Sequence, residues 1–390
     1  MPRITGTYRT TEVGGERVRA FIPYPLPPRE PALVVDGDLA ALHRDAVGAL
    51  EQLNVAGTMV PSPGWFIYGF VRKEAVISSQ IEGTQATLQD VVLFEATRRT
   101  DRPADVEEVC NYVDTLAMVR QELADASGLP LCVRLLCRAH GRLMGGVRGA
   151  EKLPGEVRRS QNWIGGSRPG NARFMPPPAD VVPEVLGDLE RWLHEGDPLP
   201  PLVRAGIAHV QFETIHPFLD GNGRIGRLLV VILLERWGLL AAPLLYLSVA
   251  FKRHRQEYYD RLGAVRTDGD WEGWTGFFLR CVREAAEDGV STARRLHTLI
   301  GGSRRLLTGH KDATLTAVRL FELLPDHPMV TLQSAAALLD TSSPTAGKTL
   351  DVLCRAGVLR EVTGRRRDRV YAFQSYLDVL AEDTGVSGSE

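Results

Sequence analysis

The sequence is poor in cysteine, has no excess of charge of either sign and contains no long apolar run. The five cysteines among its 390 residues are Cys110, Cys132, Cys137, Cys281 and Cys354. They are scattered and odd in number, so they predict neither a disulfide framework nor a cysteine metal site. Buried thiols in a reducing cytoplasm are the simplest expectation.

Neither the charge balance nor the apolar runs favour a general affinity for nucleic acid or membranes. The formal net charge is −2, which gives no general attraction to nucleic acid or to acidic membranes. The longest apolar run, residues 228–234, stops at Glu235 and is far too short to span a bilayer. The N-terminal segment MPRITGTYRTTEVGG has no apolar core behind its basic residues, unlike a secretory signal. We therefore expect a cytoplasmic protein without a membrane partner.

The length allows two or three domains, and the hydrophobic fraction of 44% is that of a globular protein. Residues 1–35 read as an extended, proline-rich arm, and helical periodicity dominates from Asp38 onward. The pattern predicts a mainly α fold, with helices over residues 38–53, 64–80, 86–99, 104–126, 130–146, 179–195, 203–215, 223–237, 251–267 and 271–299. We divide the chain into residues 1–100 (arm and first helices), 101–300 (helical core) and 301–390.

The last of these segments has a different character. Residues 331–339 predict a short helix, and Pro344 opens a second helix that ends near Gly357. Two β-rich arms around a basic turn follow. This order predicts a small winged-helix domain. Phosphate contacts are expected from its polar and basic residues, namely Thr345, Lys348, Thr349, Arg365, Arg366, Arg367 and Arg369. Contact with DNA and contact with another protein both remain open for this domain.

One stretch concentrates reactive groups: residues 216–227 read HPFLDGNGRIGR. Helical spacing over residues 203–215 predicts a helix that Pro217 should end at His216. An imidazole at such a junction can accept a proton from a hydroxyl. The glycines at 221 and 223 predict a turn whose N–H groups converge on an anion at the start of the next helix.

The residues around this turn complete a phosphate site. Arg224 and Arg227 lie three apart at the start of that helix and oppose its dipole, so they favour a bound anion. Asp220 offers a hard oxygen ligand suited to Mg²⁺ that bridges substrate phosphates. Each element alone has an ordinary explanation as a helix end, a turn or a solvated face. Their convergence in one loop predicts polyphosphate bound beside a base.

The stretch agrees with the motif HPFx(D/E)GNGRxxR at every specified position and so resembles the Fic (filamentation induced by cAMP) family. Members typically transfer AMP from ATP to a hydroxyl side chain of a target protein and release pyrophosphate. The resemblance implies a Fic-type helical core, ATP as substrate and Mg²⁺ as cofactor. It assigns His216 as the base and Asp220 as the metal ligand. It implies phosphate contacts from Gly221, Asn222, Gly223 and Arg224 for the α- and β-phosphates, and from Arg227 for the γ-phosphate.

Residues 71–83, VRKEAVISSQIEG, resemble the inhibitory motif of the same family, (S/T)xxxE(G/N). On a helix Ser78 and Glu82 share a face, and Gly83 is a C-terminal breaker. In the family the glutamate pairs with the second arginine of the active-site motif, here Arg227. Glu82 would then occupy the place of the γ-phosphate within the nucleotide site. The resemblance therefore implies an autoinhibited enzyme.

Two further features are assigned around this site. Residues 163–178 contain turn signals between short extended runs, and the resemblance identifies them as the flap, a hairpin that docks the target backbone by strand addition. Its candidate residues are Ile164, Gly165, Arg173 and Phe174; a plain surface hairpin is the alternative. Tyr258 is the candidate for contact with adenine, although tyrosines at helical spacing more often belong to the core.

The main hypothesis is an adenylyltransferase acting on Ser, Thr or Tyr hydroxyls of target proteins and on itself, held in check by Glu82. One alternative keeps the fold but uses another nucleotide or removes AMP. The other is a winged-helix DNA-binding regulator with a nucleotide-sensing core. Assembly as a homodimer is also left open.

Overall fold

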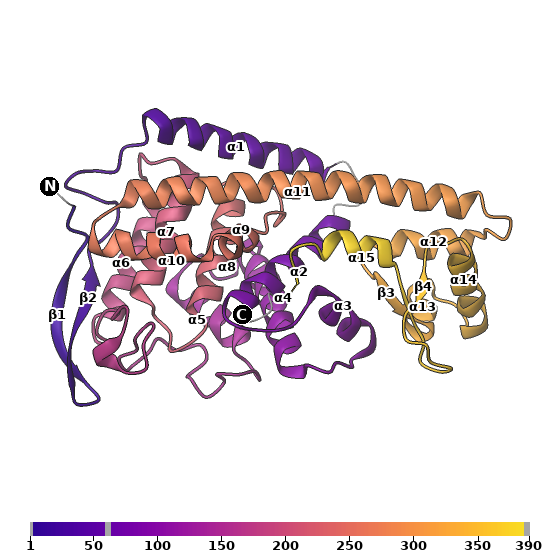
Figure 1. Cartoon of the computed structure of the whole chain (residues 1–390), viewed down its shortest axis with the longest axis horizontal. Coiled ribbons are helices and arrows are strands. Elements are labelled where there is room, and N and C mark those ends of the chain that lie inside the picture. The colour runs from indigo at the N-terminus through magenta and orange to yellow at the C-terminus, as the bar shows by residue number, and fades with distance from the viewer. Residues whose placement is uncertain (1–2, 59–63, 386–390) are drawn as a thin grey trace. The chain divides into compact units, whose positions relative to one another are not determined.

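The computed structural model describes residues 3–58 and 64–385, and within them the chain is mainly helical (Figure 1). The predicted mainly α fold is confirmed. The helices are α1 (Gly37–Gly57), α2 (Gly64–Ile81), α3 (Leu88–Thr97), α4 (Pro103–Ala124), α5 (Val133–Leu143), α6 (Val182–His194), α7 (Pro201–Ile215), α8 (Asn222–Arg236), α9 (Ser248–Arg253), α10 (Arg255–Thr267), α11 (Trp271–Thr308), α12 (Leu315–Leu323), α13 (Leu332–Leu339), α14 (Ser343–Arg355) and α15 (Gln374–Leu380). The strands are β1 (Gly6–Val13), β2 (Glu16–Pro23), β3 (Met329–Thr331), β4 (Arg360–Glu361) and β5 (Val370–Ala372).

Every helix expected before residue 250 is present, with ends shifted by a few residues. The helix expected over 251–267 was wrong as a single element, because the chain breaks at His254 (φ −107°, ψ 37°) between α9 and α10. The sequence pattern also missed α12 and α15, which are short. None of the helices in the described ranges has both the length and the apolar character needed to cross a bilayer.

The chain forms two compact units. The first comprises residues 1–51, 111–241 and 247–285, and the second residues 52–110, 242–246 and 286–390. These units cut across the three segments expected from the sequence, because α1, α4 and α11 each continue from one unit into the other.

The first unit is built around α7 and α8. Every residue of α7 from Ala205 to Ile215 is buried, so this part of the helix has no solvated face. Glycines allow its close packing. A Cβ on Gly206 would lie 2.7 Å from the ring of Phe278, and a Cβ on Gly226 would lie 2.6 Å from Oε1 of Glu213. The loop that joins the two helices is therefore held between two tightly packed elements.

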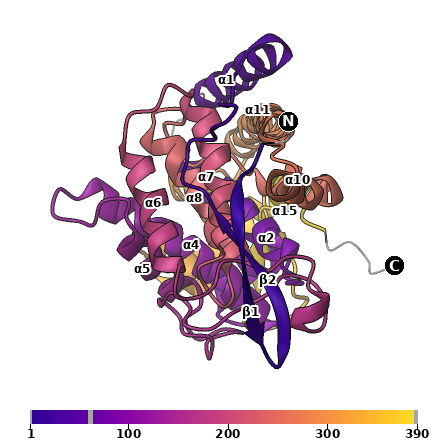
Figure 2. The ribbon, with the colours of Figure 1, turned by 90° about the vertical axis from the view of Figure 1, so that its left-hand side faces the viewer.

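The N-terminal arm is a β-hairpin, which corrects the expectation of a plain extended segment. β1 pairs with β2 in antiparallel register from Gly6 with Pro23 to Val13 with Glu16. Gly14 and Gly15, with φ of 58° and 80°, form its two-residue turn, a conformation that favours glycine. Figure 2 shows this hairpin in the first unit, where β2 contacts α7.

Within the second unit, the segment from α12 to β5 contains a three-stranded antiparallel sheet in the order β3-β5-β4. Thr331 caps α13: its side chain accepts from the N–H of Ser334, whose hydroxyl accepts from the N–H of Thr331. The aromatic rings of Phe321 and Phe373 lie 6.1 Å apart in the core of this segment. The expected helix, turn, helix and β-hairpin are all present here.

Candidate active site

His216 lies at the end of α7 in the left-handed region of backbone space. Its φ is 49° and its ψ is 61°, and its N–H donates to the carbonyl of Phe212 at 2.9 Å. Pro217 disfavours continuation of the helix through His216. Positive φ is uncommon for a residue with a Cβ, so surrounding contacts must hold this conformation. The predicted departure of His216 from the helix is confirmed.

The imidazole of His216 is largely buried and neutral. Its side chain is 19% exposed, and Nδ1 lies 3.9 Å from Oε2 of Glu213. Burial, together with the charges of Arg266 and Arg158, lowers the pKa of His216 to about 3, although the backbone of Glu213 and the charge of Asp220 act in the opposite direction. A neutral imidazole is the form that accepts a proton.

Arg158 holds the backbone on both sides of this histidine. Its Nε donates to the carbonyl of His216 at 2.9 Å, and its own N–H donates to the carbonyl of Pro217 at 2.9 Å. Its other guanidinium nitrogens donate to the carbonyls of Ser160 and Pro177. Burial lowers the pKa of Arg158 to about 10, so it remains charged at pH 7. The left-handed turn is thus fixed by a buried cation bonded to carbonyl oxygens.

Asn222 closes the loop. Its Oδ1 accepts from the N–H of Phe218 at 2.9 Å, and its Nδ2 donates to the carbonyl of Phe218 at 2.8 Å. Asn162 donates to the same carbonyl at 3.0 Å. The buried amide of Asn222 is therefore engaged inside the loop. Its side chain positions the loop, so the expected phosphate contact of Asn222 falls to its backbone N–H.

His140 of α5 supports the loop from another direction. Its ring stacks on Phe218, with centroids 3.9 Å apart and planes 3° from parallel. Nδ1 accepts from the N–H of Gly155 at 2.9 Å, which leaves the proton on Nε2 to be donated to the carbonyl of Asp220 at 3.0 Å. Burial lowers the pKa of His140 to about 4, so this neutral form is kept at pH 7.

The carboxylate of Asp220 is 34% exposed and lies between two cations. Nζ of Lys152 lies 3.1 Å from Oδ2, and a guanidinium nitrogen of Arg224 lies 3.8 Å from Oδ1. Burial opposes ionisation, but Lys152, the N–H of Gly221 and Arg224 outweigh it, and the pKa of Asp220 is lowered. Asp220 is therefore an ionised oxygen donor with a partly open side.

The start of α8 carries concentrated positive charge. Gly221 is the N-cap with φ 75°, and a Cβ there would lie 2.9 Å from Sδ of Met144. Arg224 and Arg227 are each 3% exposed, so the solvated-face explanation is wrong for both. Buried arginines at the positive end of a helix favour a bound anion. The structure brings these residues together with Asp220 and His216 in one unit.

The expected flap is a short, irregular hairpin in the same unit. Ile164 and Phe174 exchange two backbone hydrogen bonds of 2.9 and 3.1 Å, which form an isolated antiparallel bridge. Gly165 follows with φ 68°. The carbonyl of Met175 instead accepts from the N–H of Phe21 in β2 at 2.9 Å. The bridge between Ile164 and Phe174 is therefore isolated, because the chain turns at Met175 to pair with β2.

The expected flap shares a neighbour with His216. The guanidinium of Arg266 lies 3.9 Å from the ring centroid of Phe174, and its charge contributes to the low pKa of His216. Arg173 forms an ion pair of 2.7 Å with Asp260. The expected flap therefore lies close to His216.

Two family models match this chain. Residues 40–121 match the Fic/DOC family N-terminal model, and residues 130–234, which include the whole His216 loop, match the Fic/DOC family model. The chain therefore contains a Fic/DOC family N-terminal domain followed by a Fic/DOC family domain.

Curated and solved Fic proteins extend the comparison. Protein adenylyltransferase Fic of Drosophila erecta is 29% identical over 248 residues, which are 63% of this chain and 46% of that protein. A probable protein adenylyltransferase of Aquifex aeolicus is 30% identical over 200 residues, or 50% of this chain and 55% of that protein. A solved Fic family protein from Desulfovibrio desulfuricans has 25% identity and a TM-score of 0.54, covering 85% of this chain and 95% of that one. The chain spans about half the length of the curated relatives it matches.

The residues that resemble the Fic inhibitory motif lie in the second unit. Ser78 is in the last turns of α2, which ends at Ile81. Gly83 has a φ of 101°, so its expected role as a breaker is confirmed, but the helix stops one residue before Glu82. The pairing of Glu82 with Arg227 stays a prediction.

Tyr258 lies in the aromatic core of the first unit. It is 1% exposed, and its hydroxyl lies 2.8 Å from Nε2 of the buried His209. Its ring stacks on Phe251 with centroids 4.6 Å apart. Contact of this tyrosine with adenine stays a prediction.

Sequence reasoning missed three supporting residues, His140, Lys152 and Arg158. They belong to no motif, and a lone histidine among apolar helix positions carries no distinctive signal. Only their contacts with the loop reveal their role. All three act on Asp220 or on the backbone next to His216.

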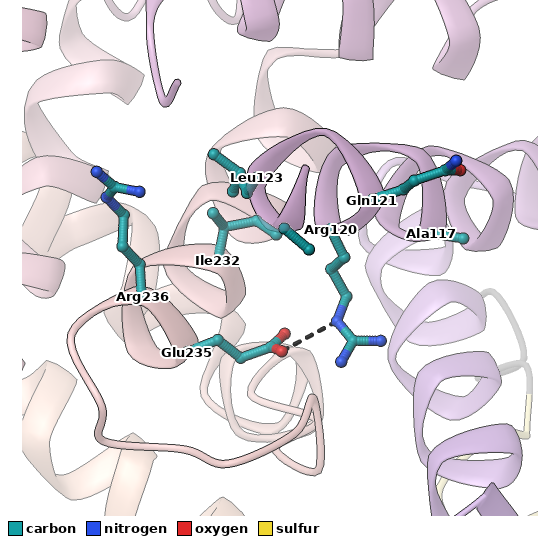
Figure 3. Close-up of a pocket in the computed structure, with 8 residues that line it drawn as sticks. Ala117, Arg120, Gln121, Leu123, Ile232, Glu235 and Arg236 are labelled. Carbon is teal, nitrogen blue, oxygen red and sulfur yellow. Dashed lines mark hydrogen bonds and ion pairs between the residues drawn. The ribbon is translucent and has the colours of Figure 1, made fainter. Parts of the chain in front are cut away.

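A separate pocket of about 620 Å³ involves the C-terminal half of α8 (Figure 3). Across it, Nε of Arg120 lies 2.9 Å from Oε2 of Glu235. Its lining residues are Ala117, Arg120, Gln121, Leu123, Ala124, Ile232, Glu235 and Arg236. None of them belongs to the Fic motif, so we do not assign this pocket to the reaction.

Proposed function

We propose that this Fic protein transfers AMP from ATP to Ser, Thr or Tyr hydroxyls of target proteins, itself included, and releases pyrophosphate. The observation that carries the proposal is the neutral His216, held in a left-handed turn beside the arginine-lined start of α8. A base next to concentrated positive charge suits attack on a phosphate. The curated relatives named protein adenylyltransferase support the same activity.

In this mechanism His216 takes the proton of the target hydroxyl while the hydroxyl oxygen forms a bond to the α-phosphorus. The bond from that phosphorus to the oxygen bridging to the β-phosphate breaks, and this oxygen leaves with pyrophosphate. The backbone of residues 221–223 and Arg224 hold the α- and β-phosphates, and Arg227 holds the γ-phosphate. Fixed charges in a buried site stabilise the transition state because they need no reorganisation.

Asp220 would hold Mg²⁺. No cluster of three or more His, Cys, Asp or Glu side chains suited to a metal occurs in the described part of the chain. Mg²⁺ is commonly bound by one or two carboxylates and completed by substrate phosphates and water, so a single ionised, partly open carboxylate fits it. When bound, the ion supplies neutralisation of phosphate charge.

We propose that Glu82 restrains the enzyme by pairing with Arg227 in place of the γ-phosphate, with Ser78 and Gly83 shaping the segment. The motif, and the end of α2 next to Glu82, support this role. Breaking a partly buried ion pair can cost about 3 kcal/mol, which corresponds to about 100-fold in a two-state population. The resting enzyme would then be largely inactive yet switchable.

We further propose that the flap docks the target chain along the edge near Ile164 and Phe174, with Gly165 and Arg173 beside it. Backbone pairing at a strand edge aligns an extended segment without demanding a particular sequence.

The five cysteines, all free thiols, are in keeping with a reducing cytoplasm. A homodimer stays a prediction.

The test is incubation of the full chain with Mg²⁺ and ATP labelled on the α-phosphate. We expect slow self-labelling, loss of label in His216→Ala, and faster labelling in Glu82→Gly by 10- to about 100-fold. Label from the γ-phosphate must not be incorporated. Equal rates for Glu82→Gly and the parent would remove the inhibitory role alone.

The same assay separates the alternatives. Incorporation from another nucleotide but not from ATP would indicate a different donor. Release of AMP from a previously labelled protein would indicate an enzyme that removes AMP from its target. Absence of any turnover in Glu82→Gly at saturating ATP and Mg²⁺ would defeat the transfer proposal.

We also infer that residues 315–373 form a winged-helix module, a fold that contacts either DNA or another protein. The chain order α12, β3, α13, α14, β4, β5 and the antiparallel sheet support this assignment, because a helix–turn–helix followed by a hairpin is the arrangement of such modules.

A further inference from the structure

The second unit carries a surface that AMP transfer does not use. In it α13 packs against α14, and Asp340, in the left-handed conformation at φ 48°, ends α13 and starts the turn between them. Leu339, Leu350 and Leu353 are buried in this module. The β4–β5 hairpin follows directly after α14. The fold therefore has a defined outer helix and a defined hairpin tip.

The start of α14 is exposed and polar. Ser343, Thr345 and Lys348 are all exposed, and the hydroxyls of Ser342 and Thr345 lie 3.1 Å apart. Thr349 was expected on this surface but is buried, and its hydroxyl donates to the carbonyl of Thr345 at 3.0 Å. In helix–turn–helix proteins the first residues of the second helix contact base edges, and hydroxyls and lysine are suitable groups for that contact.

The hairpin after α14 is held by hydrogen bonds at its base. The carboxylate of Glu361 accepts from the N–H of Thr363 at 2.8 Å and from the N–H of Gly364 at 3.0 Å. The N–H of Val362 donates to the carbonyl of Val370 at 3.0 Å. The residues beyond these bonds are therefore presented on a structured support.

The tip of this hairpin is strongly basic. Residues 365–369 are four arginines and one aspartate, all exposed. The aspartate, Asp368, is already paired with Arg99 at 3.6 Å. Within the described residues, Arg365, Arg366 and Arg367 have no carboxylate at ion-pair distance. The whole chain has a net charge of −2, so this concentration of positive charge is local.

One side of the tip is unsuited to an anion. There the tip lines a groove of about 640 Å³ together with residues of α3 and the segment after it. Asp90, Asp101 and Asp351 also line this groove. Their carboxylates repel phosphate, so a polyanion is expected on the opposite side of the tip and along the exposed start of α14.

We propose that this surface binds duplex DNA. The start of α14, with Thr345 and Lys348, enters the major groove, and the tip arginines contact phosphates of the adjacent backbone. The proposal rests on the winged-helix assignment but is independent of AMP transfer. Two separate features support a duplex over a single strand: an exposed helix that a major groove accommodates, and a second, charged element beside it that reaches the backbone.

The test measures binding of the full chain to a labelled mixed-sequence duplex at several salt concentrations. Each phosphate contact contributes about −0.9 to the slope of log K against log salt. The variant Arg365→Gln/Arg366→Gln/Arg367→Gln should therefore lose up to about 3 units of slope. Lys348→Gln should lose about 1 unit, and Thr345→Ala should alter the preferred sequence in a selection experiment with little change in slope.

The matched control is Arg17→Gln/Arg29→Gln/Arg134→Gln, which removes the same charge from exposed positions of the first unit. It should bind the duplex like the parent. If the triple tip variant is unstable, Arg366→Gln alone should still lose about 1 unit of slope. A single-stranded RNA and polyglutamate-coated beads serve as competing partner classes.

Three results would overturn the proposal: equal slopes for the tip variant and its control, preference for single-stranded RNA or for polyglutamate, or no duplex binding at about 50 mM salt. AMP transfer is measured in the same samples. Retained self-labelling without duplex binding overturns the DNA proposal alone. Duplex binding by a protein that shows no AMP transfer supports this surface and rejects only the transfer reaction.

Discussion

The ammonium of Lys152 lies 3.1 Å from Oδ2 of Asp220, the carboxylate proposed to hold Mg²⁺. The ammonium and the metal therefore compete for the same oxygen. In Lys152→Gln the carboxylate loses this competitor, and half-maximal self-labelling should need less Mg²⁺. A partly exposed ion pair contributes about 0.2–1 kcal/mol, so we expect a decrease of roughly 1.5- to 5-fold.

This decrease is measured by titrating Mg²⁺ at fixed ATP. Lys311→Gln, at an exposed position of the second unit, is the matched control and should not change the requirement. An increased Mg²⁺ requirement in Lys152→Gln would show instead that the lysine holds the phosphates.

Without nucleotide, His216 should remain neutral far below pH 6.5. Burial lowers its pKa to about 3 in the folded protein, against about 6.5 for an unfolded chain. Its NMR signal, assigned by its loss in His216→Ala, should therefore not shift between pH 8 and pH 5. In urea the same signal should titrate near pH 6.5. A midpoint near 6.5 in the folded protein would show that the ring is solvated.

His140 is expected to act as a positioning residue. His140→Phe keeps the stack on Phe218 but leaves the N–H of Gly155 and the carbonyl of Asp220 without their partner. Each such loss costs about 1–3 kcal/mol. We expect lower stability in urea and, at a temperature where the variant is folded, a higher KM for ATP.

The control for His140→Phe is His194→Phe. His194 lies in the same unit, and its Nε2 is 2.6 Å from the carbonyl of Leu131, away from the loop. It should lose stability without a change in KM. An unchanged KM in His140→Phe would limit His140 to a role in stability.

Tyr258→Phe distinguishes a core residue from an adenine contact. Its hydroxyl is bonded to His209, so its removal should reduce the free energy of unfolding by about 1 kcal/mol. KM for ATP should stay the same, because the ring is retained in the core. A several-fold rise in KM with unchanged stability would return Tyr258 to the nucleotide site.

Local sequence signals predicted the helices and the loop well, because capping, proline and apolar spacing act over a few residues. Pro217 predicted the end of α7, and Gly221 predicted the start of α8. The pattern failed where long-range contacts decide. The flap arm at Met175 turns to β2, and Thr349 is buried by packing that no local rule reveals.

The chain's own order of residues determined which groups are available: a histidine before a proline, an acid, a glycine turn and two arginines within one dozen positions. Only the tertiary structure decided their state. Desolvation and the neighbouring Arg158 and Arg266 make His216 neutral, while Lys152 and Arg224 keep Asp220 ionised. Arg158, Arg266 and Lys152 come from segments outside the motif, and electrostatic energy depends on distance in space and on burial. The motif alone therefore does not determine the protonation states of His216 and Asp220.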